Sequence, residues 1–200
     1  MFRNSVILVL FFICFFGQFV LAEEGSNLFF QNFLEIEMDA PLSDDSAWGF
    51  HADTCFFQVP SQDVTNIFGS VGVTRNFAEG RFAVQGLVGV VANWTYEDGE
   101  TVDAFMPTAK LIFKPVENFS GLIRSSMFGK DYYGFYKTEY KVFSESIAVN
   151  VGLHVEQVRS DFYPGPRLTF VRGPATFETG YFFAPHDGAD AFRFGIVLSF

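Results

Sequence analysis

Apolar and polar residues alternate along most of this chain from residue 28 onward. Large apolar side chains occupy every second position in a series of runs, several of which reach the 9–11 residues that a tilted strand needs to cross a bilayer. The runs cover residues 28–38, 48–58, 64–75, 81–96, 101–114, 119–128, 132–143, 147–159, 167–171, 176–183 and 191–200. A period of two is typical of strands. The pattern therefore predicts one all-β domain of consecutive hairpins.

The composition shows that one face of these strands is unusually apolar. Phenylalanine accounts for 29 of 200 residues, yet no run of about 18 apolar residues follows residue 22. Such a chain either encloses a large dry core or turns the apolar face of many strands toward lipid. The opposite face is rich in Ser, Thr, Asn, Gly and Ala. This favours an apolar outside and a polar inside, the arrangement of a membrane barrel.

The charged residues of the polar face are balanced in sign, as expected for groups that must pair in a confined lumen. We expect them to form lumen ion pairs that fix the strand register, or alternatively a selectivity lining or a polar plug. The candidates are six acids (Glu35, Glu37, Asp53, Glu139, Glu156 and Glu178), six bases (Lys110, Arg124, Lys137, Lys141, Arg167 and Arg193) and His154.

Aromatic residues near strand ends predict interface girdles, although ordinary strand propensity also explains them. The candidates are Trp48, Trp94, Tyr96, Tyr132 and Tyr133.

Residues 1–22 have the features of a secretory signal peptide. Arg3 precedes an apolar stretch, and Val20, Leu21 and Ala22 form a small-residue cleavage site before two glutamates. An uncleaved membrane anchor is the alternative. We expect residues 23–200 to form the mature domain, in which Cys55 is the one remaining cysteine and so has no internal disulfide partner.

The final stretch, A-F-R-F-G-I-V-L-S-F, has an apolar face made of Phe192, Phe194, Ile196, Leu198 and Phe200. This pattern resembles the C-terminal strand of bacterial outer-membrane β-barrel proteins. The resemblance implies location in the outer membrane, contact with its lipids, and recognition of this strand by the barrel-assembly machinery. We therefore expect a single closed antiparallel transmembrane β-barrel.

The number of strands can be counted in three ways. Eleven runs are visible, but single-chain bacterial barrels have an even number. The two runs around Gly173 and Pro174 could be one bent strand, which gives ten, or a long run could hide a turn, which gives twelve. Residues 160–166, which include Pro164-Gly165-Pro166, are expected to form a loop. The barrel should accordingly have about 10–12 strands with short hairpin connections.

A second resemblance involves the last third of the chain. The succession G-L-H-V-E-Q-V-R-S-D-F-Y-P-G-P-R-L-T-F from Gly152, followed by F-E-T-G-Y-F from Phe177, an acidic loop and the closing strand, is similar to the end of the BcsS family of cellulose-biosynthesis outer-membrane proteins. It implies an exopolysaccharide-associated role, polysaccharide-export components as partners, and no catalytic residues.

Several other functions are less well supported by the residues. The formal net charge of −10 argues against nucleic acid, and the three histidines lack ligand spacing for a metal. His51 with Asp53, and His154 with Glu156, could each pair a base with an orienting carboxylate, but no nucleophile accompanies them. We expect a non-enzymatic protein without a cofactor. The alternatives are a soluble secreted β-barrel that binds an apolar ligand and an outer-membrane lipid-modifying enzyme.

Overall fold

A computed structural model describes residues 28–59, 64–95, 101–129, 131–144, 146–184 and 189–200. The expected signal peptide, residues 1–22, lies outside the described residues. The described residues form eleven strands: β1 (Leu28–Pro41), β2 (Trp48–Val59), β3 (Val64–Phe77), β4 (Phe82–Thr95), β5 (Thr101–Val116), β6 (Phe119–Phe128), β7 (Asp131–Ser144), β8 (Ala148–Val158), β9 (Asp161–Arg172), β10 (Ala175–Phe182) and β11 (Asp190–Ser199). They contain no helix that is long and apolar enough to cross a membrane.

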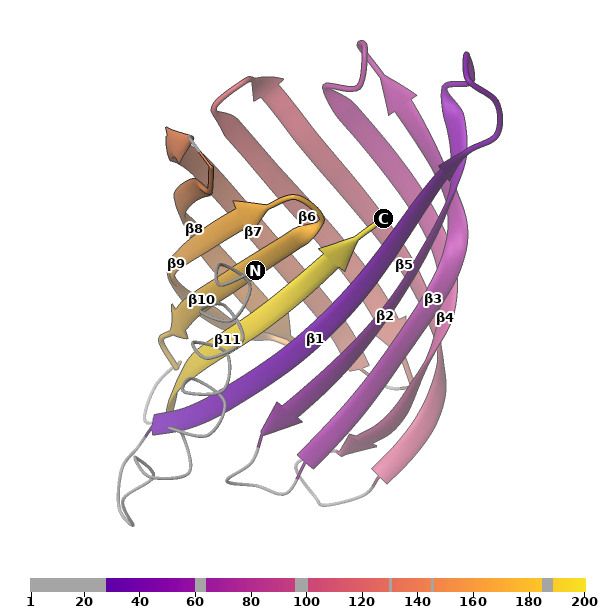
Figure 1. Cartoon of the computed structure of the whole chain (residues 1–200). Helices are drawn as coiled ribbons and strands as arrows, with labels where there is room; N and C mark the ends of the chain where they lie inside the picture. Colours follow the sequence, from indigo (N-terminus) through magenta and orange to yellow (C-terminus); the bar gives the residue numbers. More distant parts are fainter. Residues whose placement is uncertain (1–27, 60–63, 96–100, 130, 145, 185–188) are drawn as a thin grey trace, which may run out of the picture.

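The strands close into one barrel, in which each strand pairs with its neighbours in sequence and β1 pairs with β11 (Figure 1). The predicted all-β closed barrel is thus confirmed, and the counts of ten and twelve strands are wrong. Consecutive strands are antiparallel, but β1 and β11 are parallel, with Leu34 opposite Ile196. The expectation of a wholly antiparallel barrel is therefore wrong at this seam. An odd number of alternating strands gives the first and last strands the same direction.

All but the first residue of the expected loop at residues 160–166 is instead part of β9, which pairs with β8 and β10. Proline lacks a donor but retains its carbonyl, and the oxygen of Pro164 accepts a hydrogen bond of 2.8 Å from the backbone N–H of Phe183. Gly165 permits a close approach, since a Cβ at this position would lie 1.5 Å from the carbonyl oxygen of Tyr181. The Pro-Gly-Pro sequence therefore continues the sheet.

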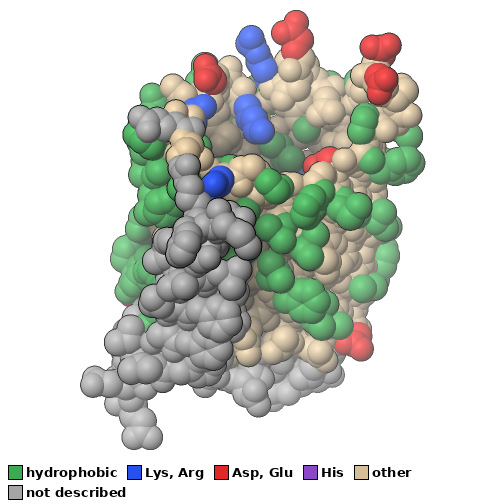
Figure 2. Space-filling model, viewed as in Figure 1, with side chains coloured by type: hydrophobic (Ala, Val, Ile, Leu, Met, Phe, Trp, Pro, Cys, Tyr) green, Lys and Arg blue, Asp and Glu red, His purple; other side chains and the backbone are tan. Residues whose placement is uncertain are grey.

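The outer face of the barrel is apolar around most of its circumference. Exposed large apolar side chains occur on every strand from β1 to β9, including Met38, Phe50, Val88, Phe105 and Leu153. Figure 2 shows hydrophobic side chains spread over the visible wall of the barrel, with charged side chains gathered mainly at one end. Single exposed apolar residues are common in soluble proteins, whereas a continuous apolar wall is not.

The interior is apolar at the end of the barrel where β6 joins β7, which we call the lower rim. Val91, Met106 and Phe128 are buried there, and Phe68 and Tyr133 pack against them. The opposite end, at the top of Figure 1, carries the β3–β4 turn at residues 78–81 and is called the upper rim. Between the two rims the buried inward side chains are largely polar or charged.

Candidate functional site

The first group of interior charges, cluster 1, consists of Glu37, His51, Asp53, Ser70 and Lys110. The Nζ atom of Lys110 lies 2.6 Å from Oδ2 of Asp53 and 3.6 Å from Oε1 of Glu37. Ser70 donates a hydrogen bond from its hydroxyl to Oδ1 of Asp53. Lys110 belongs to β5, whereas its two acidic partners belong to β2 and β1, which are not its neighbours in the sheet. These ion pairs therefore cross the lumen.

His51 connects cluster 1 to the upper rim. Its Nδ1 lies 2.9 Å from Oδ1 of Asp39, whose side chain is 60% exposed, while the His51 side chain itself is only 2% exposed. Its Nε2 lies 3.3 Å from the Nζ atom of Lys110 and 3.6 Å from Oδ2 of Asp53. The histidine thus bridges an exposed carboxylate and a buried ion pair.

A further ion pair crosses the lumen between β6 and β1. Arg124 Nη1 lies 3.5 Å from Oε1 of Glu35, and both side chains are largely buried. Together with cluster 1, this pair connects β1 and β2 to the strands on the opposite wall. Ion pairs in such positions select a single strand register, because a shift by one residue would move every charge to the outer face.

The second group, cluster 2, consists of Glu139, Glu156, Arg167, Glu178 and Arg193. Nε of Arg167 lies 2.9 Å from Oε1 of Glu139, and Nη2 of Arg167 contacts Glu178. Nη2 of Arg193 lies 2.6 Å from Oε2 of Glu156. Each arginine thus has a buried carboxylate partner, which offsets the cost of removing its charge from water.

Three uncharged residues complete the surroundings of Arg193. The Oε1 atom of Gln31 accepts two hydrogen bonds from its guanidinium across the parallel seam, at 2.8 and 2.7 Å. The guanidinium carbon lies 4.9 Å from the ring centre of Phe57 and 4.2 Å from that of Phe182. Arg193 therefore joins β11 to β1, β2, β8 and β10 at one point.

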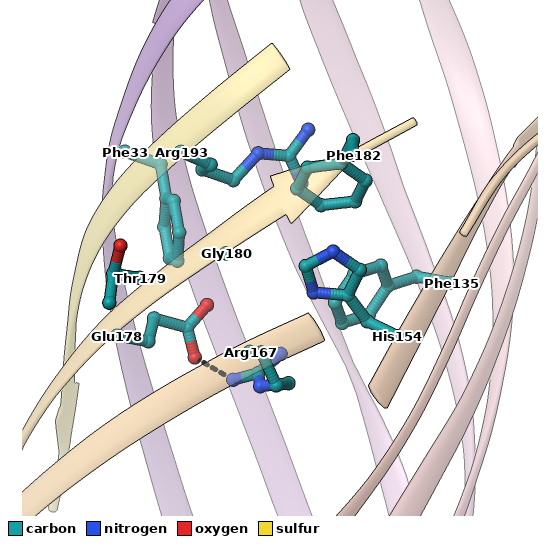
Figure 3. Close-up of a pocket in the computed structure, with 9 residues that line it drawn as sticks. All are labelled: Phe33, Phe135, His154, Arg167, Glu178, Thr179, Gly180, Phe182 and Arg193. Atoms are coloured by element: carbon teal, nitrogen blue, oxygen red, sulfur yellow. Dashed lines mark hydrogen bonds and ion pairs between the residues drawn. The ribbon is translucent and has the colours of Figure 1, made fainter. Parts of the chain in front are cut away.

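Cluster 2 borders a cavity of about 10 Å³, in which there is room for roughly one water molecule. It is lined by Phe33, Phe135, His154, Arg167, Glu178, Thr179, Gly180, Phe182 and Arg193 (Figure 3). The ring of His154 stacks on Phe182 with ring centres 3.7 Å apart, and its Nε2 lies 3.1 Å from the carbonyl oxygen of Tyr181. This histidine is held as part of the packing.

The structure brings most of the sequence-predicted charged residues together in the lumen. They form three groups there: the Glu35–Arg124 pair, cluster 1 and cluster 2. Lys141 lies near the upper rim, where its Nζ is 3.6 Å from Oε1 of Glu117. Lys137 is opposite His154 in the β7–β8 register. Phe192, Phe194, Ile196 and Leu198 are half-buried on the other face of β11, and Phe200 is exposed after its end.

Sequence reasoning missed several uncharged partners of these clusters. Gln31 and Phe57 share the period-two positions of the acids on β1 and β2, and Ser70 lies on the polar face of β3, which has no acid; that spacing was the available signal. Tyr133 was predicted for an interface girdle, but its hydroxyl donates a 2.8 Å hydrogen bond to Glu156 inside the barrel. The side chain of Trp94 and all of Tyr96 lie outside the described residues.

The arrangement of these side chains is suited to holding strands together. Lys110 and Arg167 have side chains that are 3% and 2% exposed, and the hydroxyl of Ser70 is already bonded to Asp53. Among the described residues, no group of three or more His, Cys, Asp or Glu side chains is placed to hold a metal ion. What the geometry provides is a set of buried cross-lumen ion pairs.

The chain was compared with protein-family models, with curated proteins and with solved structures, and no match was found in any of the three.

Proposed function

We propose that this protein spans the outer membrane of a Gram-negative bacterium as a closed β-barrel with a filled interior and a structural role. The observation that carries the proposal is the segregation of side chains by face. Exposed apolar residues follow the outside from β1 to β9, while the paired charges of clusters 1 and 2 lie inside. An apolar outer face is unfavourable in water, whereas in a membrane barrel such a face meets lipid.

Aromatic residues mark the edges of this apolar face, which supports a membrane position. Near the upper rim, Phe82 pairs with Phe77 and with Phe113 on its two neighbouring strands. Near the lower rim, the hydroxyl groups of Tyr132 and Tyr136 lie 3.0 Å apart on β7. Aromatic side chains form girdles where a barrel meets the lipid headgroups, and a tyrosine can place its polar hydroxyl there.

The height of the apolar face also fits a bilayer. On β4 the outward positions run from Phe82 to Ala92 and include Val84, Val88 and Val90. With a rise of about 3.4 Å per residue and a tilt of about 40°, this stretch spans roughly 26 Å along the barrel axis. Outer-membrane barrels have an apolar band of about 25 Å.

A structural role is favoured over an open pore because of the filling of the lumen. Lys110, Gln85 and Thr108 are nearly inaccessible on the inner face, and Met106 and Phe128 are buried at the lower rim. A water-filled channel would leave such inward groups exposed. Side chains that bridge the lumen instead stiffen the barrel wall.

The decisive experiment places a charge on the outer face. Val88 is 53% exposed in the middle of β4, so Val88→Lys would put an ammonium group near the bilayer midplane. In a membrane this costs about 2–4 kcal/mol, whereas on a soluble barrel it changes stability by less than about 0.5 kcal/mol. Val88→Ile is the matched apolar control.

The measurement is the outer-membrane content and the heat-dependent gel mobility of the wild type and both variants. We expect the wild type and Val88→Ile to fractionate with the outer membrane and to migrate differently before and after boiling, and Val88→Lys to be strongly reduced in that fraction. A soluble Val88→Lys protein that folds as well as the wild type would support the apolar-ligand carrier instead.

An exopolysaccharide-associated role is the second candidate. The segment that resembles the BcsS family extends from the middle of β8 through β9 and β10 to β11, which are consecutive neighbours in the barrel wall. Deletion of the gene should then reduce cellulose at the cell surface, as measured by dye binding, and complementation should restore it. Unchanged dye binding would leave only the structural role.

A further inference from the structure

Arg75 has an unusual position on the outer face, close to the upper rim. It lies near the end of β3 and is paired in register with Trp48, the first residue of β2. Its guanidinium carbon is 4.9 Å from the ring centre of Trp48 and 4.8 Å from that of Phe77. The guanidinium is therefore in cation–π contact with two aromatic rings that are themselves exposed.

These two contacts leave the hydrogen-bonding capacity of Arg75 unused. The two aromatic rings attract the charge of the guanidinium but accept no conventional hydrogen bond from its five N–H donors. No carboxylate or carbonyl within the described part of the chain accepts a hydrogen bond or forms an ion pair with the Arg75 side chain. Arg75 is exposed and thus presents a set of donors that has no acceptor among the described residues.

The chemistry of the neighbourhood defines the ligand. Planar guanidinium donors match phosphate oxygens in a bidentate manner, and the exposed rings of Trp48 and Phe77 offer apolar surface directly beside them. Arg81 in the β3–β4 turn and Lys114 near the end of β5 add positive charge to the same rim of the barrel, where the backbone N–H of Lys114 donates to the carbonyl oxygen of Arg81 at 2.7 Å. A ligand that fits has an anionic phosphate joined to an apolar body.

We propose that Arg75, Trp48 and Phe77 form a binding site for the phosphate headgroup of a membrane lipid. The phosphate accepts hydrogen bonds from the edge of the Arg75 guanidinium, and the first part of the acyl chains lies along Trp48, Phe77 and the apolar wall below them. The site rests on the proposed function, because only a membrane barrel presents this face to lipid headgroups.

The test is native mass spectrometry of the delipidated full-length protein in detergent, titrated with palmitoyl-oleoyl phosphatidylglycerol. Diolein, which has the acyl chains without the phosphate, is the comparison lipid. The variants are Arg75→Gln, Arg75→Lys and Arg172→Gln. Arg172 is the last residue of β9, and no aromatic contact to its side chain is found among the described residues. Arg172→Gln therefore removes an equal charge without affecting an aromatic site.

We expect the wild type to bind phosphatidylglycerol more tightly than diolein. Arg75→Gln should weaken phosphatidylglycerol binding by roughly five- to tenfold, since a charge-assisted bidentate contact is lost. Arg75→Lys should be intermediate, because it retains the charge but not the planar fork, and Arg172→Gln should bind as the wild type does. Equal loss in Arg75→Gln and Arg172→Gln, or no loss in Arg75→Gln, would overturn the site.

Failure of the lipid site can be distinguished from failure of the proposed membrane barrel. Each variant is first checked for the heat-dependent mobility shift and for its presence in the outer-membrane fraction. A protein that passes both checks and shows no preference for the phosphate-bearing lipid refutes this site alone. A wild type that fails them refutes the membrane barrel and the site with it.

Discussion

Arg167 shows how a single residue is accommodated inside the barrel. Its side chain is 2% exposed and lies between Glu139 on β7 and Glu178 on β10, which are on opposite sides of β9 in the barrel wall. A buried cation without partners is strongly disfavoured, and the same is true of a buried carboxylate that has lost its cation. The stability of this part of the lumen therefore depends on the presence of all three groups.

Removing the Arg167 charge should destabilise the barrel more than removing a charge at the rim. Arg167→Met leaves two buried carboxylates without a partner, and we expect a loss of about 3–5 kcal/mol in the free energy of unfolding. Arg172→Met, at the last residue of β9, should lower the free energy of unfolding by less than about 1 kcal/mol. Urea unfolding in lipid vesicles measures both, and Glu139→Gln with Glu178→Gln should recover part of the Arg167→Met loss.

The contact between Gly195 and Phe33 permits a second prediction at this scale. A Cβ on Gly195 would lie 1.9 Å from Cε1 of Phe33 across the parallel seam. Gly195→Ala should therefore lower the free energy of unfolding by about 1–3 kcal/mol, and Phe33→Leu should relieve part of that loss. Gly86→Ala is the matched control, because nothing lies within 4 Å of its added Cβ. Equal effects of the two alanine substitutions would contradict the packing of this seam.

At the scale of the elements, the seam between β1 and β11 distinguishes this barrel from one with an even number of strands. Ten aligned residue pairs, from Leu28 opposite Asp190 to Glu37 opposite Ser199, define a parallel ladder. Gln31 and Arg193 strengthen it from the inside. Beyond the paired stretch, the backbone N–H of Asp39 donates to the carbonyl oxygen of Phe200 at 2.9 Å.

Cross-linking tests this parallel register directly. In a background without Cys14 and Cys55, cysteines at Leu34 and Ile196 face each other on the outer side and should form a disulfide readily under mild oxidation. Cysteines at Leu34 and Leu198, displaced by two residues along the strand, should react much more slowly. Gel mobility under non-reducing conditions measures both rates, and a reversed order would show a different register or a different closing strand.

At the scale of the whole molecule, the barrel separates an apolar outside from a polar inside that is largely closed by its own side chains. Clusters 1 and 2 connect strands that are not neighbours, so the interior resists changes in the shape of the wall. Below them, Val91, Met106 and Phe128 form an apolar layer at the lower rim. These contacts favour a rigid barrel, as the proposed structural role requires.

A filled lumen has a measurable electrical consequence. The wild-type protein, reconstituted in a planar bilayer, should show no steady conductance of the size typical of porins, because side chains occupy the path of the ions. A triple variant with Phe57→Ala, Phe182→Ala and Arg193→Ala removes the guanidinium and both rings that flank it, and should raise the conductance. Steady large conductance of the wild type would favour a pore.

Much of this fold could be predicted from the sequence, because a period of two is a local property of each strand. Alternation identified the strands and placed acids such as Glu35 and Glu178 on the polar face without knowledge of the strand order. It failed at residues 160–166, since proline and glycine there suggested a loop, whereas their actual role depends on the approach of β10 to β9.

The pairing of charges was decided only by the tertiary structure. Lys110 and Asp53 are 57 positions apart, and nothing local indicates that they meet. The curvature of the closed wall brings β5 opposite β1 and β2, and the parity of the strand count makes the closing seam parallel. The sequence by itself therefore determined an all-β chain with one apolar and one polar face, while closure determined which residues share the interior, because those contacts arise only when distant strands are held in one barrel.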